Sequence, residues 1–442
     1  MKSLLIPKKL LMGSATAATQ IEGGDKNSNW YTWSSNGKIA GNGSSIVAAD
    51  HYNRYVEDID IMQQLNHEIY RMSIEWSRIE PERGVYSTEG IEHYKNEIKL
   101  LKSKGIKVLV TLHHFSHPQW FEELGQWTSN ESVLLFSKFV KKIVFELKDL
   151  VNEYCTINEP NVFVNDSFMD GKYPPGFKND SFSYFKAAKN MIVAHLKCYG
   201  IIHDVRKKLG FNDTKVGIAI HLVQFDSDLD NWKVNLSKKF MNYSFHTMFL
   251  EGMISGKLPP FFGINLFKKG KYCDFIGINY YSRHIVFPSN NPATFFGEIK
   301  FEQSLSEEDV NDLGWEIYPE GIYKVVKKTY EKYKLPIYIT ENGIPDKDDK
   351  KRSKFIYSHL VQICKLIEEG IDVQRYYHWS LLDNLEWNDG YFPRFGLVKV
   401  DYDTLKRTIR DSGLFYGEII KNKEITTEMI EKYINKGANN ED

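Results

Sequence analysis

The sequence predicts an α/β protein, a single eight-stranded parallel β/α barrel. Eight short apolar runs rich in β-branched and aromatic residues alternate with longer stretches at helical spacing, a pattern typical of parallel strands joined by helices. Eight such units favour a closed barrel. The alternative, an open doubly wound sheet, is disfavoured because no glycine-rich phosphate loop follows the first run.

The predicted strands lie, in chain order, at residues 10–15, 67–74, 107–112, 154–158, 215–220, 274–279, 336–340 and 373–379. Helices are predicted at residues 52–65, 91–104, 133–147, 182–208, 238–252, 318–333 and 352–369. In the first helix, Tyr55, Ile59 and Met62 recur on one face, and Gly105 and Gly210 stand where helices commonly end.

The remaining segments are assigned by composition. Residues 30–43 and 289–312 are expected to form loops, the second lying over the barrel mouth. The tail from about residue 421 is expected to be peripheral, with a helix at 426–435 and disorder at 437–442. Because no linker or low-complexity insertion is found, residues 1–442 are expected to form one domain.

Charge and composition exclude several classes of protein. The chain has 57 Lys+Arg and 58 Asp+Glu, so nothing in its charge favours nucleic acid or an anionic membrane as a partner. No apolar run approaches the roughly 20 residues that a membrane-spanning helix needs. The four scattered cysteines indicate free thiols in a reducing compartment. Lysines interrupt the N-terminal apolar patch, which argues against a signal peptide and for a cytoplasmic location.

Two glutamates stand at the ends of predicted buried strands. Glu341 follows the strand at 336–340, and Glu159 follows the strand at 154–158. A charged group at such a position is costly unless it is paired or used. In a barrel the carboxyl ends of all strands share one face. The two carboxylates are therefore predicted to face one pocket.

The other predicted strand ends carry amides, an imidazole, an indole, a phenol and a guanidinium. These are the side chains of Gln20, Arg71, His113 or His114, Asn158, Asn279, Tyr281 and Trp379. Planar donors and acceptors suit hydroxyl groups, and flat apolar faces suit pyranose rings. Because two facing carboxylates are the minimum equipment for cleaving a glycosidic bond, the list indicates a site for sugars.

The sequence resembles glycoside hydrolase family 1, the β-glucosidase and β-galactosidase family. The matching stretches are residues 13–23, 70–79, 156–160, 275–281, 339–343, 379–387 and 394–398. They follow one another in family order from about residue 7 to about residue 420, and residues 111–115 resemble the compact bacterial or archaeal members.

The resemblance implies a role for each matching residue. Glu159 matches the general acid/base and Glu341 the nucleophile. Gln20, His114, Asn158, Glu386 and Trp387 match residues that hold the terminal sugar, with Trp379 beneath it. Arg71 and Asn279 match residues that orient the nucleophile, and Tyr281 is assigned both to orientation and to substrate binding.

The implied activity is that of a retaining, exo-acting β-glycosidase. It would hydrolyse β-D-glucosides, β-galactosides and β-fucosides, or short oligosaccharides, through a covalent glycosyl-enzyme. Such an enzyme requires carboxyl groups roughly 5–5.5 Å apart. Arg71 and Tyr281 are expected to lower the pKa of Glu341, whereas Glu159 is expected to hold the proton that it donates.

Three residues bear on the substrate. Glu386 is retained, which favours a sugar without phosphate, because a carboxylate binds hydroxyl groups but repels phosphate. Phe115 stands where the family commonly has Trp, and His221 where it often has Asn. Both departures affect the preference for sugar and leaving group rather than the reaction.

Other functions are kept open. The same mechanism could serve a transglycosidase, and a barrel could bind sugars without catalysis. His113, His114 and His117 could suggest zinc, but neighbouring residues of a strand point to opposite faces. No metal or cofactor is expected, and the oligomeric state is left open. Trp30, Trp33 and Trp315 are expected either to line the leaving-group side or to pack loops.

Overall fold

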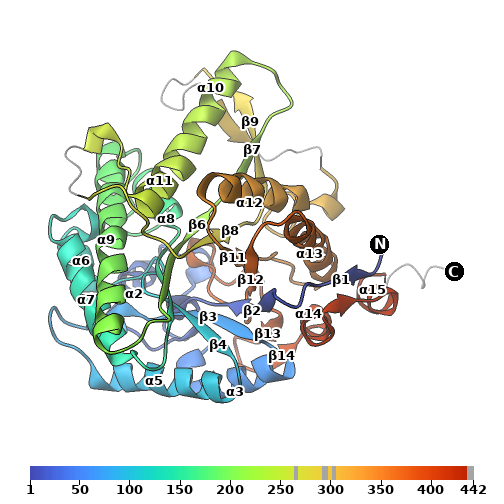
Figure 1. Ribbon diagram of the computed structural model, residues 1–442, viewed down its shortest axis with the longest axis horizontal. Helices are drawn as coiled ribbons and strands as arrows, with labels where there is room; N and C mark the ends of the chain where they lie inside the picture. The colour runs from blue at the N-terminus through green and yellow to red at the C-terminus, as the bar shows by residue number, and fades with distance from the viewer. Residues whose placement is uncertain (263–266, 291–296, 301–304, 436–442) are drawn as a thin grey trace.

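The molecule is organised around a closed parallel barrel, as predicted. The computed structural model describes residues 1–262, 267–290, 297–300 and 305–435. Eight strands pair in the order β11-β12-β2-β3-β4-β5-β6-β8 and close on themselves at the centre of the molecule (Figure 1). They are β2 (Leu11–Ala15), β3 (Ile69–Ser73), β4 (Lys107–Thr111), β5 (Glu153–Asn158), β6 (Lys215–His221), β8 (Phe275–Asn279), β11 (Ile337–Asn342) and β12 (Val373–Trp379).

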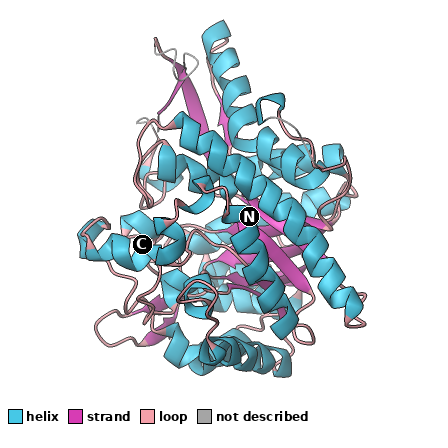
Figure 2. Ribbon diagram, turned by 90° about the vertical axis from the view of Figure 1, so that its left-hand side faces the viewer, coloured by secondary structure: helices cyan, strands magenta, loops and turns pink. Residues whose placement is uncertain are grey.

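Helices surround the barrel on its outside (Figure 2). The long ones are α3 (His51–Gln64), α5 (Thr88–Ser103), α7 (Ser132–Glu146), α9 (Ser181–Lys208), α12 (Pro319–Tyr333), α13 (Arg352–Glu368) and α14 (Asp411–Asn422). In α9 the Asp180 side chain accepts a hydrogen bond from the Ser183 backbone N–H, and Arg206, Lys207 and Lys208 occupy the last turn. Both features stabilise the ends of a helix.

The observed helices differ from the predicted ones in several places. Residues 30–43, predicted as a loop, include helix α2 (Asn29–Ser35), because the Ser28 side chain caps the Tyr31 backbone N–H. The predicted helix at 238–252 is three consecutive helical segments: α10 (Trp232–Met241), a π-helical turn over Asn242–Thr247, and α11 (Met248–Ser255). It starts earlier than predicted because Asn231 caps the Lys233 N–H. Short helices α1 (Ala18–Ile21), α4 (Trp76–Ile79), α6 (Gln119–Glu123) and α8 (Pro160–Phe168) follow or join the barrel strands.

A three-stranded sheet lies outside the barrel beside α10 (Figure 1). Strand β9 (Arg283–Pro288) pairs with β7 (Gln224–Asp226) and with β10 (Gly297–Lys300). The sheet and α10 enclose a small core of Val223, Phe225, Val234 and Val286. The prediction of one loop over 289–312 is therefore wrong at 297–300. Within that range, residues 291–296 and 301–304 lie outside the described part of the chain.

The tail is attached to the start of the chain. Strand β15 (Glu424–Ile425) pairs with β1 (Leu4–Leu5) in an antiparallel manner. Helix α15 (Thr427–Tyr433) confirms the predicted helix and buries Met429, Ile430 and Tyr433. The predicted disorder at 437–442 lies outside the described residues. A further hairpin joins β13 (Val398–Val400) to β14 (Arg407–Ile409). Among the described residues, no helix is long and apolar enough to cross a membrane.

Candidate active site

Both glutamates lie at the carboxyl ends of barrel strands. Glu341 is one of the last two residues of β11, and Glu159 directly follows β5. The pairing register shifts just before each of them, between Ile339 and Glu341 and between Cys155 and Asn158. Such irregularities redirect side chains at strand ends. Glu159 also has a left-handed backbone with φ of 40°, a strained conformation of the kind that clusters at functional sites.

The buried Arg71 guanidinium connects the two strand ends. Its Nη1 donates to Glu341 Oε1 at 2.6 Å, and its Nη2 donates to Asn158 Oδ1 at 2.6 Å. Its Nε donates to Thr111 Oγ1 at 3.1 Å. The side chain has no exposed surface, and the negative charge of Glu341 raises its pKa against the effect of burial. Arg71 therefore stays charged beside Glu341.

Asn279 and Tyr281 complete the environment of the carboxylates. Asn279 Nδ2 donates to Glu159 Oε1 at 2.7 Å and to Asn158 Oδ1 at 3.0 Å. The Tyr281 hydroxyl donates to Glu341 Oε2 at 2.6 Å. Burial raises the pKa of Tyr281 well above its ordinary value, so its hydroxyl keeps the proton that it donates. Glu159 and Glu341 thus belong to one hydrogen-bonded network.

Arg71 and Tyr281 act on the Glu341 pKa in the predicted direction, but the net shift of that pKa is upward. Arg71 and Tyr281 do lower the pKa, but burial, followed by the negative charge of Glu159, outweighs them and raises it from 4.5 to about 7. The sequence indicates the donors to Glu341, whereas the depth of burial emerges only from the fold.

A second cluster joins the start of the chain to residues after β12. Gln20 Nε2 donates to Asn384 Oδ1 and to the Leu385 carbonyl, each at 2.9 Å, and lies 3.3 Å from Glu386 Oε2. Burial, followed by the charge of Asp389, raises the pKa of Glu386 well above its ordinary value. Glu386, which sequence reasoning places at the sugar, is therefore held beside Gln20.

His114 contacts two indoles. Its ring is stacked at centroid distances of 5.8 Å from both Trp379 and Trp387. Asn158 Oδ1 already accepts from Arg71 and Asn279, so Asn158 Nδ2 is the donor to His114 Nε2 at 3.0 Å. His114 is therefore neutral with its proton on Nδ1, and burial lowers its pKa well below 6.5.

Two buried polar atoms of these clusters have no hydrogen-bond partner within the described part of the chain. They are His114 Nδ1, which is a donor, and Gln20 Oε1, which is an acceptor. Buried polar groups are rarely left unpaired in native proteins. The two atoms therefore point to a polar ligand.

The other aromatic and histidine candidates occupy distinct places. His113 packs beside His117, with Nε2 to Nδ1 at 3.4 Å, and His117 Nε2 lies 2.6 Å from Glu122. Within the described ranges, no group of three or more His, Cys, Asp or Glu side chains could hold a metal ion. Trp30 packs against Trp387 at 4.8 Å between ring centroids, and Trp315 lies 6.1 Å from Tyr281.

Sequence reasoning missed two partners of the site. Asn384 accepts a hydrogen bond from Gln20, and Tyr173 packs against Trp387, as does Phe115, which the sequence did indicate. Asn384 lies inside the 379–387 stretch that carries the family resemblance, which was a usable signal. For Tyr173, no signal in the sequence indicates its position beside Trp387.

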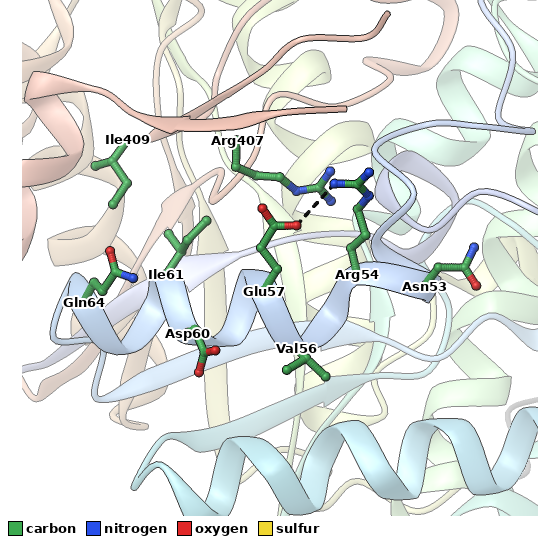
Figure 3. Close-up of a pocket in the computed structure, with 9 residues that line it drawn as sticks. All are labelled: Asn53, Arg54, Val56, Glu57, Asp60, Ile61, Gln64, Arg407 and Ile409. Carbon is green, nitrogen blue, oxygen red and sulfur yellow. Dashed lines mark hydrogen bonds and ion pairs between the residues drawn. The ribbon is translucent and has the colours of Figure 1, made fainter. Parts of the chain in front are cut away.

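A pocket on the outer surface is not part of this site. It lies between α3 and β14 (Figure 3) and includes Arg54, Glu57 and Asp60. Arg54 pairs with Glu57 at 3.3 Å, and Asp60 pairs with Lys104 at 3.0 Å. The Arg54, Glu57 and Asp60 side chains of this pocket are therefore engaged in ion pairs with one another or with a residue at a neighbouring helix.

Comparisons with known proteins agree with the barrel. The chain is 34% identical to β-glucosidase A of Thermotoga maritima, over 94% of this chain and 98% of that protein. It is 31% identical to a β-galactosidase of Saccharolobus solfataricus, over 96% of each chain. A solved β-glycosidase from Pyrococcus horikoshii superposes with a TM-score of 0.88 at 37% identity, covering 97% of this chain and 98% of that one.

A solved structure of the Thermotoga maritima β-glucosidase in complex with glucoimidazole superposes with a TM-score of 0.86 at 33% identity, covering 95% of this chain and 99% of that one. The fold and its relatives define a β-glycosidase, an enzyme that hydrolyses β-glycosidic bonds. The chain belongs to glycosyl hydrolase family 1, whose model matches residues 2–425.

Proposed function

We propose that the protein is a retaining, exo-acting β-glycosidase that cleaves β-D-glucosides and related β-galactosides and β-fucosides without phosphate. One observation carries the proposal: Glu159 and Glu341 share a buried network through Arg71, Asn158 and Asn279. Two carboxylates at one site can divide the reaction into covalent attack and proton transfer. The separation of roughly 5–5.5 Å expected of a retaining pair remains a prediction.

Glu341 is the nucleophile. Both of its oxygens accept hydrogen bonds, one from the charged Arg71 and the other from Tyr281. These donors favour the carboxylate over the carboxylic acid. The carboxylate attacks the anomeric carbon, and the resulting glycosyl ester makes Glu341 neutral.

Glu159 is the general acid and then the general base. Its Oε1 accepts a hydrogen bond from Asn279, and within the described residues its Oε2 has no hydrogen-bond donor. Oε2 can therefore hold the proton that passes to the leaving oxygen. In the second step the Glu159 carboxylate takes a proton from water as that water attacks the glycosyl ester.

The sugar is bound by the unpartnered polar atoms and by the indoles. A hydroxyl group can accept a hydrogen bond from His114 Nδ1 and donate one to Gln20 Oε1. Trp379 and Trp387 supply flat apolar surface beside His114. Glu386 favours hydroxyl groups over phosphate.

The four free, buried cysteines support the predicted cytoplasmic location.

Leaving-group dependence tests the two roles. Glu341→Ala should lose hydrolysis of aryl β-glucosides, β-galactosides and β-fucosides alike, because no nucleophile remains. Glu159→Ala should largely keep its kcat/KM on dinitrophenyl glycosides, whose leaving group departs without a proton, and lose about 10²–10⁴-fold in kcat/KM on alkyl glycosides. Steady-state rates across the panel measure both effects. A wild type inactive on every β-glycoside, or equal losses by Glu159→Ala on both leaving groups, would contradict the proposal.

A further inference from the structure

His221 places an imidazole beside Glu159. It is the last residue of β6, and its side chain is 17% exposed. Its Nδ1 lies 3.4 Å from Glu159 Oε1, the same oxygen that accepts from Asn279. The Asn161 side chain donates to the His221 carbonyl at 2.8 Å. That bond fixes the end of β6 against the helix that begins directly after Glu159.

Aromatic residues hold the ring in place. It is stacked on Tyr281 with a centroid distance of 5.8 Å and an interplanar angle of 22°. Phe245 meets it edge-on at 6.2 Å. Tyr281 itself donates to Glu341. His221 thus contacts the proposed acid/base directly and the proposed nucleophile through one residue.

The charged and titratable groups around His221 come from several elements. Glu341 accepts hydrogen bonds from Tyr281 and from Arg71, and His246 and His284 come from the π-helical turn and from β9. Burial lowers the pKa of His284 to about 4 and that of His246 well below 6.5, and His221 contributes to both shifts. Both His246 and His284 therefore stay neutral at the pH, near 6.5, at which an unperturbed imidazole gains its proton.

Resting on the proposed function, we propose that His221 is a positioning residue which, as an imidazolium, keeps Glu159 in its carboxylate form during hydrolysis of the glycosyl-enzyme. At that stage Glu341 is esterified and carries no charge. A cation 3.4 Å from one Glu159 oxygen then favours the base form.

The proton balance of this step is simple. Water attacks the anomeric carbon while Glu159 accepts its proton. The bond from that carbon to the Glu341 oxygen breaks, and Glu341 leaves as a carboxylate. His221 neither gains nor loses a proton. Its charge only decides what fraction of the glycosyl-enzyme has Glu159 ionised when the pH is low.

The test uses the full-length enzyme and the variant His221→Asn, which keeps a small donor near the position of Nδ1. With 2,4-dinitrophenyl β-glucoside, breakdown of the glycosyl-enzyme limits kcat. We expect the acidic limb of kcat to move to higher pH in the variant, with a loss on the order of tenfold near pH 5 that disappears near pH 8. With an alkyl β-glucoside, formation of the glycosyl-enzyme limits the rate, and the alkaline limb of kcat/KM should not move to lower pH.

The matched control is His246→Gln, which removes a neighbouring imidazole that accepts from the Val223 N–H. Its losses should be the same at every pH. A loss by His221→Asn that is equal at pH 5 and pH 8, or a kcat profile identical to that of the wild type, would overturn the inference while leaving the proposed function intact. A wild type without turnover of either substrate would overturn the proposed function, and the inference with it.

Discussion

Arg71 links Glu341 to Asn158, which accepts from the same Asn279 amide that donates to Glu159. Its guanidinium contacts Glu341, Asn158 and Thr111, which come from three different strands. An Arg with a planar, permanently charged head can make several such bonds at once, which a Lys cannot. The sequence predicts that Arg71 lies at a strand end; the number of its partners becomes visible only when the barrel closes.

Removing the Tyr281 hydroxyl should change the pH dependence of the reaction. Glu341 must be a carboxylate to attack, so activity falls as the pH drops through its pKa. Tyr281 lowers that pKa, so in Tyr281→Phe the pKa rises and the acidic limb of kcat/KM moves to higher pH. A hydrogen bond to a charged group is worth about 1.5–3 kcal/mol, which corresponds to a shift of about 1–2 pH units.

Tyr280→Phe is the control for this prediction. Its hydroxyl is equally lost, but it donates to the Tyr318 carbonyl at 2.6 Å and not to a carboxylate. The acidic limb should stay in place in this variant. Equal shifts in the two variants would show that Tyr281 does not act on Glu341.

At the scale of elements, strands β11 and β12 approach each other closely at the ends that carry Glu341 and Trp379. Gly343 follows β11, and a Cβ built there would lie 1.7 Å from the Trp379 carbonyl oxygen at the end of β12. Only glycine permits this contact. Because Glu341 stands two residues before Gly343, the same close approach fixes the position of Glu341 relative to Trp379.

Gly343→Ala should therefore separate β11 from β12. We expect a fall in the free energy of unfolding of about 1–3 kcal/mol or more, with loss of activity, measured by denaturant unfolding and by hydrolysis of an aryl glycoside. Gly200→Ala is the control, since a Cβ at this exposed position of α9 meets nothing within 4 Å. It should raise the free energy of unfolding by about 0.5–1 kcal/mol. Unaltered stability of Gly343→Ala would contradict the argument.

The sequence predicts the barrel elements well because their apolar periodicity is strong. It does less well where capping or long-range pairing decides the structure. Helix α2 depends on the Ser28 cap, and β10 exists because it pairs with β9. Strand β11 includes Glu341 and Asn342, which the sequence places after the strand. In the sequence alone, polar residues at the end of a strand resemble turn residues, because their pairing with a neighbouring strand cannot be seen.

At the scale of the whole molecule, barrel closure makes the site from residues far apart in the sequence. Gln20 and Glu386 are separated by 366 positions, and Arg71 and Glu341 by 270. The family resemblance predicts each of these residues, and the geometry adds the bonds among them. Neither the raised pKa of Glu341 nor the contact of His221 with Glu159 could be predicted, since both depend on burial and on distances across the barrel.

The central claim is that Glu341 forms a covalent bond to the sugar while Glu159 transfers protons. Its most direct test is incubation with 2-deoxy-2-fluoro-β-glucosyl fluoride, whose fluorine slows breakdown of the ester, followed by mass spectrometry of the digested protein. We predict one added fluoroglucosyl group, located on Glu341, and none in Glu341→Gln. A label on Glu159, or complete absence of a covalent adduct in an enzyme that hydrolyses β-glucosides, would contradict the account.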